Sequence, residues 1–66
     1  MTKQEIIDWH KAHPYGARDE AYIDAVLAHV KRGWMERPHQ RIGQVIANIV
    51  GHHQDVFYIP DEDMVP

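Results

Sequence analysis

The chain has 66 residues and a formal net charge of −3 at pH 7, which suits one domain with a small core and argues against non-specific nucleic-acid binding. It contains neither cysteine nor serine, so disulfides, thiolate zinc sites and cysteine or serine nucleophiles are excluded. No apolar run approaches the ~18 residues of a membrane span, and the polar N-terminus does not resemble a signal peptide. We therefore expect a cytoplasmic protein that does not enter a membrane.

The first predicted element is a helix over residues 2–13. Thr2 and Glu5 have the spacing of a capping box, in which each side chain accepts a hydrogen bond from the backbone of the other residue. Pro14 ends the helix, because proline lacks a backbone donor and disfavours helical geometry in the residue before it.

The second predicted element is a helix over residues 19–32. It starts at Asp19, and Gly33 is the expected C-terminal stop. Its apolar residues recur at helical spacing on one face: Tyr22, Ile23, Val26, Leu27 and Val30.

The third predicted helix begins near Pro38, which suits a first helical turn, and ends at Gly51. One side carries the apolar residues Ile42, Val45, Ile46, Ile49 and Val50. A rotation of about 100° per residue places Arg41, Gln44 and Asn48 together on the nearly opposite side. We call these three residues the polar stripe.

Gly43 lies on the flank between the two faces of this helix. A glycine inside a helix costs about 1 kcal/mol relative to alanine. We expect this cost to be offset by the close approach of another helix or of the C-terminal arm. A close-packed dimer seam is the alternative explanation.

Residues 55–59 have the composition of a strand, but the sequence offers no second strand to pair with it. We therefore expect this segment to cross the helices as an extended arm. The sequence thus predicts a mainly α fold over residues 1–66, namely a single small three-helix bundle with a C-terminal extended arm.

Charge is unevenly distributed along the chain. Basic residues gather at Lys31, Arg32, Arg37 and Arg41, and acidic residues crowd the end at Asp55, Asp61, Glu62 and Asp63. One interpretation is that the acidic end folds back near the basic window. The other is that the two form separate patches with different partners.

The polar stripe has three interpretations. It can be a solvated face, with Arg41 paired to Asp55 or Asp61. It can be a recognition surface for a protein partner, because arginine and amide groups offer directional donors and acceptors. It can also read DNA from a helix-turn-helix unit, because arginine pairs with guanine and the amides pair with adenine. Arg41 is the only basic residue on that face, which weighs against the DNA-binding interpretation.

The aromatic residues are expected to lie mostly in the core: Trp9, Trp34, Tyr15, Tyr22, Phe57 and Tyr58. Trp34 and Tyr58 are also candidate anchors for a partner. If they are exposed together with Met35, they mark an interaction surface, since aromatic residues and methionine are enriched in interfaces.

The chain offers little for catalysis. Its six histidines lie in separate segments and form no His-Glu-x-x-His pattern, so we expect no metal site and no cofactor. There is no phosphate-cradling glycine loop, and an acidic terminal segment is typically solvated rather than an acid/base pair. We expect a protein that is not an enzyme.

The second half of the chain resembles short uncharacterised bacterial and phage proteins. Those proteins carry Arg-x-Gly-Gln, an Asn four residues on, and then Asp-x-Phe-Tyr with an acidic residue soon after. The matching residues are Arg41, Gly43, Gln44, Asn48, Asp55, Phe57, Tyr58 and Asp61. The resemblance implies a small protein of a phage or mobile element. Proteins of that size and origin commonly bind a host protein, including components of antiviral defence.

These observations predict a small non-enzymatic protein-binding module of phage or mobile-element type, which inhibits a host protein by steric occupation of its surface. The predicted partner-binding residues are Arg41, Gln44, Asn48, Trp34 and Tyr58. The partner is a host or phage protein, and a homodimer is compatible with the sequence. The alternative function is a small helix-turn-helix DNA-binding protein that uses the polar stripe.

Overall fold

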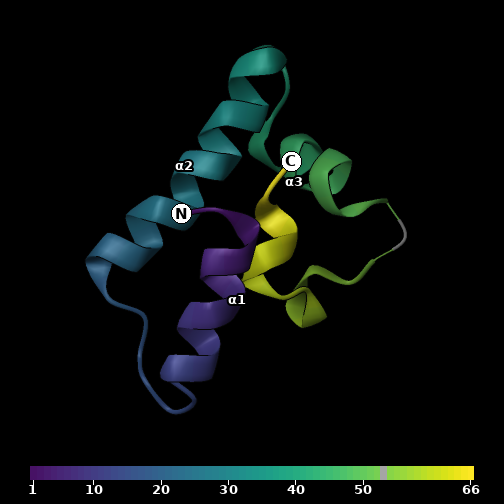
Figure 1. Ribbon diagram of the computed structural model, residues 1–66. Helices are drawn as coiled ribbons and strands as arrows, with labels where there is room; N and C mark the ends of the chain where they lie inside the picture. The colour runs from purple at the N-terminus through teal and green to yellow at the C-terminus, as the bar shows by residue number, and fades with distance from the viewer. Residues whose placement is uncertain (53) are drawn as a thin grey trace.

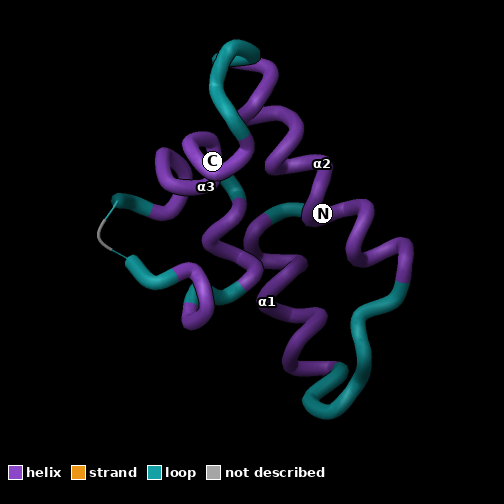
Figure 2. Tube along the Cα trace, turned by 180° about the vertical axis from the view of Figure 1, so that it is seen from behind, coloured by secondary structure: helices purple, strands orange, loops and turns teal. Residues whose placement is uncertain are grey.

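Three α-helices and two short 3-10 helices make up the regular structure of the described part of the chain (Figure 1). The structure is a computed structural model and describes residues 1–52 and 54–66. The helices are α1 (Lys3–Ala12), α2 (Glu20–Glu36) and α3 (Ile42–Val50), followed by η1 (Val56–Tyr58) and η2 (Asp61–Met64). Over the described residues the chain forms helices and loops and no strand (Figure 2). The prediction of a mainly α three-helix fold is confirmed.

The starts of α1 and α2 are fixed by the side chains of their N-cap residues. The Thr2 hydroxyl accepts from the Glu5 backbone N–H at 3.2 Å, and the Glu5 carboxylate accepts from the Thr2 backbone N–H at 3.1 Å. This is the predicted capping box. At α2 the Asp19 carboxylate accepts from the Tyr22 backbone N–H at 2.8 Å, which satisfies an otherwise unpaired helical donor.

The predicted boundary between the second and third helices was wrong. Helix α2 does not stop at Gly33 but continues to Glu36, and Pro38 lies in the connection rather than in α3. Gly33 instead sits where α3 crosses α2. A Cβ atom there would lie 3.3 Å from Ile49 Cδ1 and 3.5 Å from Pro66 Cγ. The missing side chain therefore permits close helix packing rather than a helix stop.

Gly43, unlike Gly33, is not closely approached by another described part of the chain. A Cβ atom at this position would meet nothing within 4 Å. The expected close approach of another helix or of the arm was therefore wrong. Gly43 lies in the first turn of α3, on an exposed part of the surface.

The segment after α3 is folded into turns rather than extended throughout. Asp55 precedes η1, and its carboxylate accepts from the Phe57 backbone N–H at 3.0 Å. Helix η2 then packs against all three α-helices (Figure 1). The arm is thus a central part of the bundle.

The core is small. The residues that are almost fully enclosed are Ile6, Tyr22, His29, Val30, Val45 and Val50. Ile6 is completely buried. None of the described helices combines the length and apolar character needed to cross a membrane.

Candidate functional site

The polar stripe is on the surface. Arg41, Gln44 and Asn48 are all exposed. Gln44 Oε1 accepts from the Arg41 backbone N–H at 2.9 Å, and Asn48 Nδ2 donates to Gln40 Oε1 at 2.8 Å. The Gln44 contact closes the first turn of α3, which explains why this helix begins at Ile42. The expected pairing of Arg41 with Asp55 or Asp61 is not found among the described ion pairs.

Trp34 ties the end of α2 to the following connection. Its indole Nε1 donates to the Gln40 backbone carbonyl at 2.8 Å, and the side chain is half-buried. Its ring also borders a shallow apolar hollow with Lys31, Met35 and Pro38. Trp34 therefore has a clear structural role, and its role as a partner anchor stays a prediction.

Tyr58 belongs to the most exposed apolar segment that the structure describes. The side chains of Val56, Phe57 and Tyr58 are 59%, 83% and 79% exposed. The Phe57 and Tyr58 rings meet edge to face at 5.0 Å, an arrangement that aromatic pairs favour. We call these three residues the aromatic turn. Asp55 fixes its backbone through the cap at Phe57.

The expectation that the aromatic residues lie mostly in the core was wrong, because Tyr22 alone among them is buried. Tyr22 is buried and Trp9 and Trp34 are half-buried, whereas Tyr15, Phe57 and Tyr58 are exposed. Phe57 was not predicted as a site residue. The available signal was Asp55, because an aspartate commonly bonds the backbone two residues on and so starts a turn.

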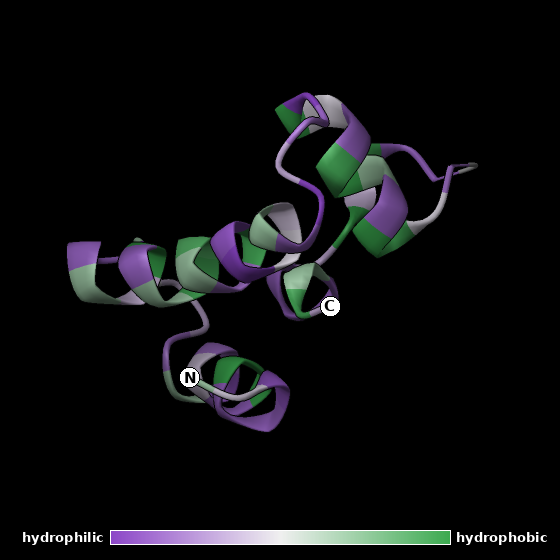
Figure 3. Ribbon diagram, turned by 90° about the horizontal axis from the view of Figure 1, so that it is seen from above, coloured by the Kyte–Doolittle hydropathy of each residue, from purple (hydrophilic) through white to green (hydrophobic). Residues whose placement is uncertain are grey.

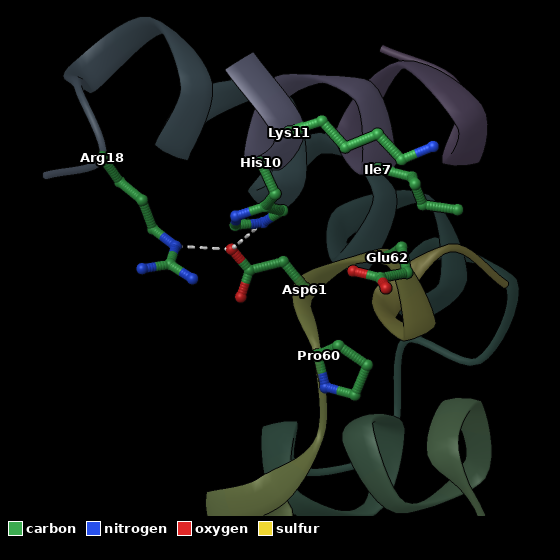
Figure 4. A pocket seen from close by; sticks show the side chains of 7 residues that line it. All are labelled: Ile7, His10, Lys11, Arg18, Pro60, Asp61 and Glu62. Atoms are coloured by element: carbon green, nitrogen blue, oxygen red, sulfur yellow. Dashed lines mark hydrogen bonds and ion pairs between the residues drawn. The ribbon is translucent and has the colours of Figure 1, made fainter. Parts of the chain in front are cut away.

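A polar cluster joins the C-terminal segment to α1 and α2, and Figure 4 shows its members Asp61, Arg18 and His10. Asp61 Oδ2 accepts from Arg18 Nε at 2.5 Å and from the Tyr22 hydroxyl at 2.7 Å. Because the Tyr22 hydroxyl donates to Asp61, His10 Nε2 is the donor in its 2.8 Å contact with that hydroxyl. The same ring nitrogen lies 3.4 Å from Asp61 Oδ2. We call Asp61, Arg18, Tyr22 and His10 the Asp61 cluster.

The electrostatics of this cluster follow from partial burial and shared hydrogen bonds. Burial by itself would raise the pKa of Asp61, but the hydrogen bonds from Tyr22 and Arg18 outweigh it and hold the pKa below its usual value. Burial and the hydrogen bond to the Asp61 carboxylate raise the pKa of Tyr22 to about 12. At neutral pH, Asp61 is an anion that orients donors, which is a positioning role rather than a proton-transfer role.

The acidic end does fold back, but not onto the basic window around Lys31. Asp61 pairs with Arg18, and Asp63 lies 3.9 Å from Lys3 Nζ. Lys3 and Arg18 both come before the basic window in the sequence. They reach the acidic residues because η2 packs against α1. A shallow groove runs beside this junction, and its walls carry Ile7, His10, Lys11, Arg18, Pro60, Asp61 and Glu62 (Figure 4).

His29 is buried, and its two hydrogen bonds show which ring nitrogen carries the hydrogen. Arg32 Nη2 donates to His29 Nδ1 at 2.7 Å, so the ring hydrogen is on Nε2, which donates to the Met1 carbonyl. Across residues 1–52 and 54–66, no group of three or more metal-ligating side chains comes together.

Comparison with known proteins gives no match to any protein-family model, to any curated protein or to any solved structure.

Proposed function

We propose that the protein is a small non-enzymatic binding module that docks onto a partner protein through the aromatic turn, with the polar stripe as a source of directional contacts. One observation carries the proposal. Phe57 and Tyr58 are mostly solvent-exposed on a turn whose backbone is fixed by Asp55. A fixed aromatic pair loses little conformational entropy on binding and buries a large apolar area, which is the character of interface anchors.

DNA binding through the polar stripe is the alternative function, and the hydrogen bonds on α3 weigh against it. Bidentate recognition of adenine uses both the oxygen and the nitrogen of an amide. Gln44 Oε1 already accepts from the Arg41 backbone, and Asn48 Nδ2 already donates to Gln40. Each internal bond occupies one hydrogen-bonding site of the amide and fixes its orientation, which restricts the geometry in which the amide can read a base.

The resemblance of residues 41–61 to bacterial and phage proteins extends the proposal to its biological setting. In that setting the partner is a host protein, including a component of antiviral defence, and inhibition is steric. Trp34 would contribute through its hollow with Met35 at the end of α2.

The test is site-specific photo-crosslinking in bacterial lysate, with and without nuclease. Tyr58→p-benzoylphenylalanine carries the probe, and Tyr15→p-benzoylphenylalanine is the control, because Tyr15 is 99% exposed in the α1–α2 connection. We expect a stoichiometric protein adduct at position 58 that survives nuclease, and none at position 15.

Two double variants then separate the surfaces. Phe57→Ala/Tyr58→Ala is expected to abolish capture, and Gln44→Ala/Asn48→Ala to weaken it, with circular dichroism confirming that both fold. Unchanged capture by Phe57→Ala/Tyr58→Ala would overturn the proposal. Recovery of nucleic acid that weakens steeply as salt rises would establish the DNA alternative instead.

A further inference from the structure

The apolar stripe along α2 is covered over only half of its length. Ile23, Leu27, Val30 and Trp34 follow one another at intervals of four, three and four residues, the spacing of a helix–helix seam. Val30 is buried in the half of α2 where α3 packs, whereas Ile23 and Leu27 are 42% and 55% exposed. Helices α3 and η2 pack against α2, and seen from above α1 also lies beside it, whereas one long side of α2 faces away from the other described elements (Figure 3).

The charges on this exposed side are arranged so that the surface complements itself. At about 100° per residue, Glu20, Asp24 and Lys31 lie within about 60° of Leu27 around the helix. Both carboxylates precede Leu27 in the chain, and the ammonium group follows it. None of the three belongs to an ion pair within the described part of the chain. The face therefore has an acidic half and a basic half.

An antiparallel second copy of α2 fits this pattern. With Leu27 on the two-fold axis, a rise of about 1.5 Å per residue puts Lys31 of one copy at nearly the same height as Asp24 of the other, on the same side of the seam. Each such pair occurs twice. A parallel copy would instead place the charged flanks of the two helices on opposite sides of the seam, so Asp24 and Lys31 would have no charged partner across it. The antiparallel arrangement also sets the two helix dipoles in opposite directions, which is favourable.

We propose that a second copy of this chain docks on the exposed side of α2, forming a two-fold symmetric dimer centred on Leu27. The small core gives the dimer a physical role, because chains of this size commonly need an additional source of stability, and oligomerisation is one. The proposal does not rest on the proposed function, because the aromatic turn and the polar stripe are not used.

Sedimentation equilibrium of the full chain tests the dimer directly. We expect the wild type to approach twice the chain mass of 7.7 kDa as concentration rises. Leu27→Glu should weaken association by well over tenfold, because it places two carboxylates at the axis. Ile42→Glu is the matched control: Ile42 is 52% exposed on α3, beside Gly43. A wild type that stays monomeric at millimolar concentration would overturn the proposal, and so would dissociation by Ile42→Glu but not by Leu27→Glu.

Charge reversal tests the register. Lys31→Glu alone and Asp24→Lys alone are each expected to weaken the dimer by about tenfold, because each brings like charges together twice. The double variant Asp24→Lys/Lys31→Glu restores both pairs and should recover the wild-type affinity. The two residues are seven apart in one helix, too far to pair within a copy. Failure of the double variant to recover would rule out the antiparallel arrangement.

Discussion

A single carboxylate oxygen, Asp61 Oδ2, holds the segment after α3 against two other parts of the chain. It accepts hydrogen bonds from Arg18 and from Tyr22. The sequence drew attention to Asp61 through the resemblance, but it did not give the partners. Arg18 and Asp61 are 43 residues apart, and no periodicity links positions so distant. Only packing of η2 beside α1 and α2 brings them together.

Removing the charge of Asp61 tests this connection. Asp61→Asn should lower the free energy of unfolding by about 1–3 kcal/mol, because Arg18 and Tyr22 lose an ionic acceptor. Urea unfolding followed by circular dichroism measures the change. Glu62→Gln is the control, since the Glu62 carboxylate has no ion pair within the described residues, and it should change stability by less than about 0.5 kcal/mol. If the two variants changed the free energy of unfolding equally, Asp61 would not hold the C-terminal segment as described.

The same carboxylate gives an acid-sensitive contribution to stability. Its pKa in the folded protein is below its usual value. Its contribution is therefore complete above about pH 4 and is lost as the pH falls through the lowered value. The Asp61→Asn variant cannot lose this contribution, so its free energy of unfolding should fall less than that of the wild type over the same acidic pH range.

Tyr22 gives the opposite dependence in alkali. Its pKa rises from 10.0 to about 12 on folding. The folded state keeps the proton where the unfolded state has lost it, so stability is complete below about pH 10 and falls between pH 10 and 12. The tyrosinate absorbance should contain a component near pH 12 that Tyr22→Phe removes. A titration without that component would show that Tyr22 does not bond Asp61.

At the scale of elements, local signals predicted the starts of α1 and α2 and the ends of α1 and α3, but not the end of α2 or the start of α3. The Thr2 cap and the Asp19 cap act within one turn, so the sequence contains all that they need. Gly33 was misinterpreted as a stop because its use depends on Ile49, which reaches it only when α3 crosses α2. Tyr58 was a predicted anchor, but the exposure of its neighbours Val56 and Phe57 was missed for a similar reason, since composition alone does not show which apolar segment lacks a covering element.

Alanine substitution at two glycines separates their roles. Gly43→Ala should stabilise the protein by about 0.5–1 kcal/mol, because the new methyl group meets nothing and the helix gains propensity. Gly33→Ala should gain less or lose stability, because its methyl group would lie 3.3 Å from Ile49 Cδ1 and that side chain would have to shift. Thermal unfolding of the two variants gives the comparison. A destabilised Gly43→Ala variant would mean that another surface covers this position.

At the scale of the whole molecule, a core this small makes stability sensitive to single residues. Total stability for a chain of this length is about 3–10 kcal/mol, and truncating a fully buried isoleucine costs about 2–5 kcal/mol. Ile6→Ala should therefore lose a large fraction of the total stability and melt at a markedly lower temperature. Ile42→Ala, which removes the same atoms from an exposed site, should stay folded. Differential scanning calorimetry distinguishes the two, and similar melting temperatures would contradict the assignment of Ile6 to the core.

Helix η2 contacts all three α-helices, yet it follows every one of them in the chain. During synthesis the three helices therefore leave the ribosome before the segment that joins them is available. A nascent chain that ends at Val50 would hold helices without their common contact. The bundle can close only after Asp61 to Met64 have emerged, so we expect folding to be delayed until that moment and then to be nearly all-or-none.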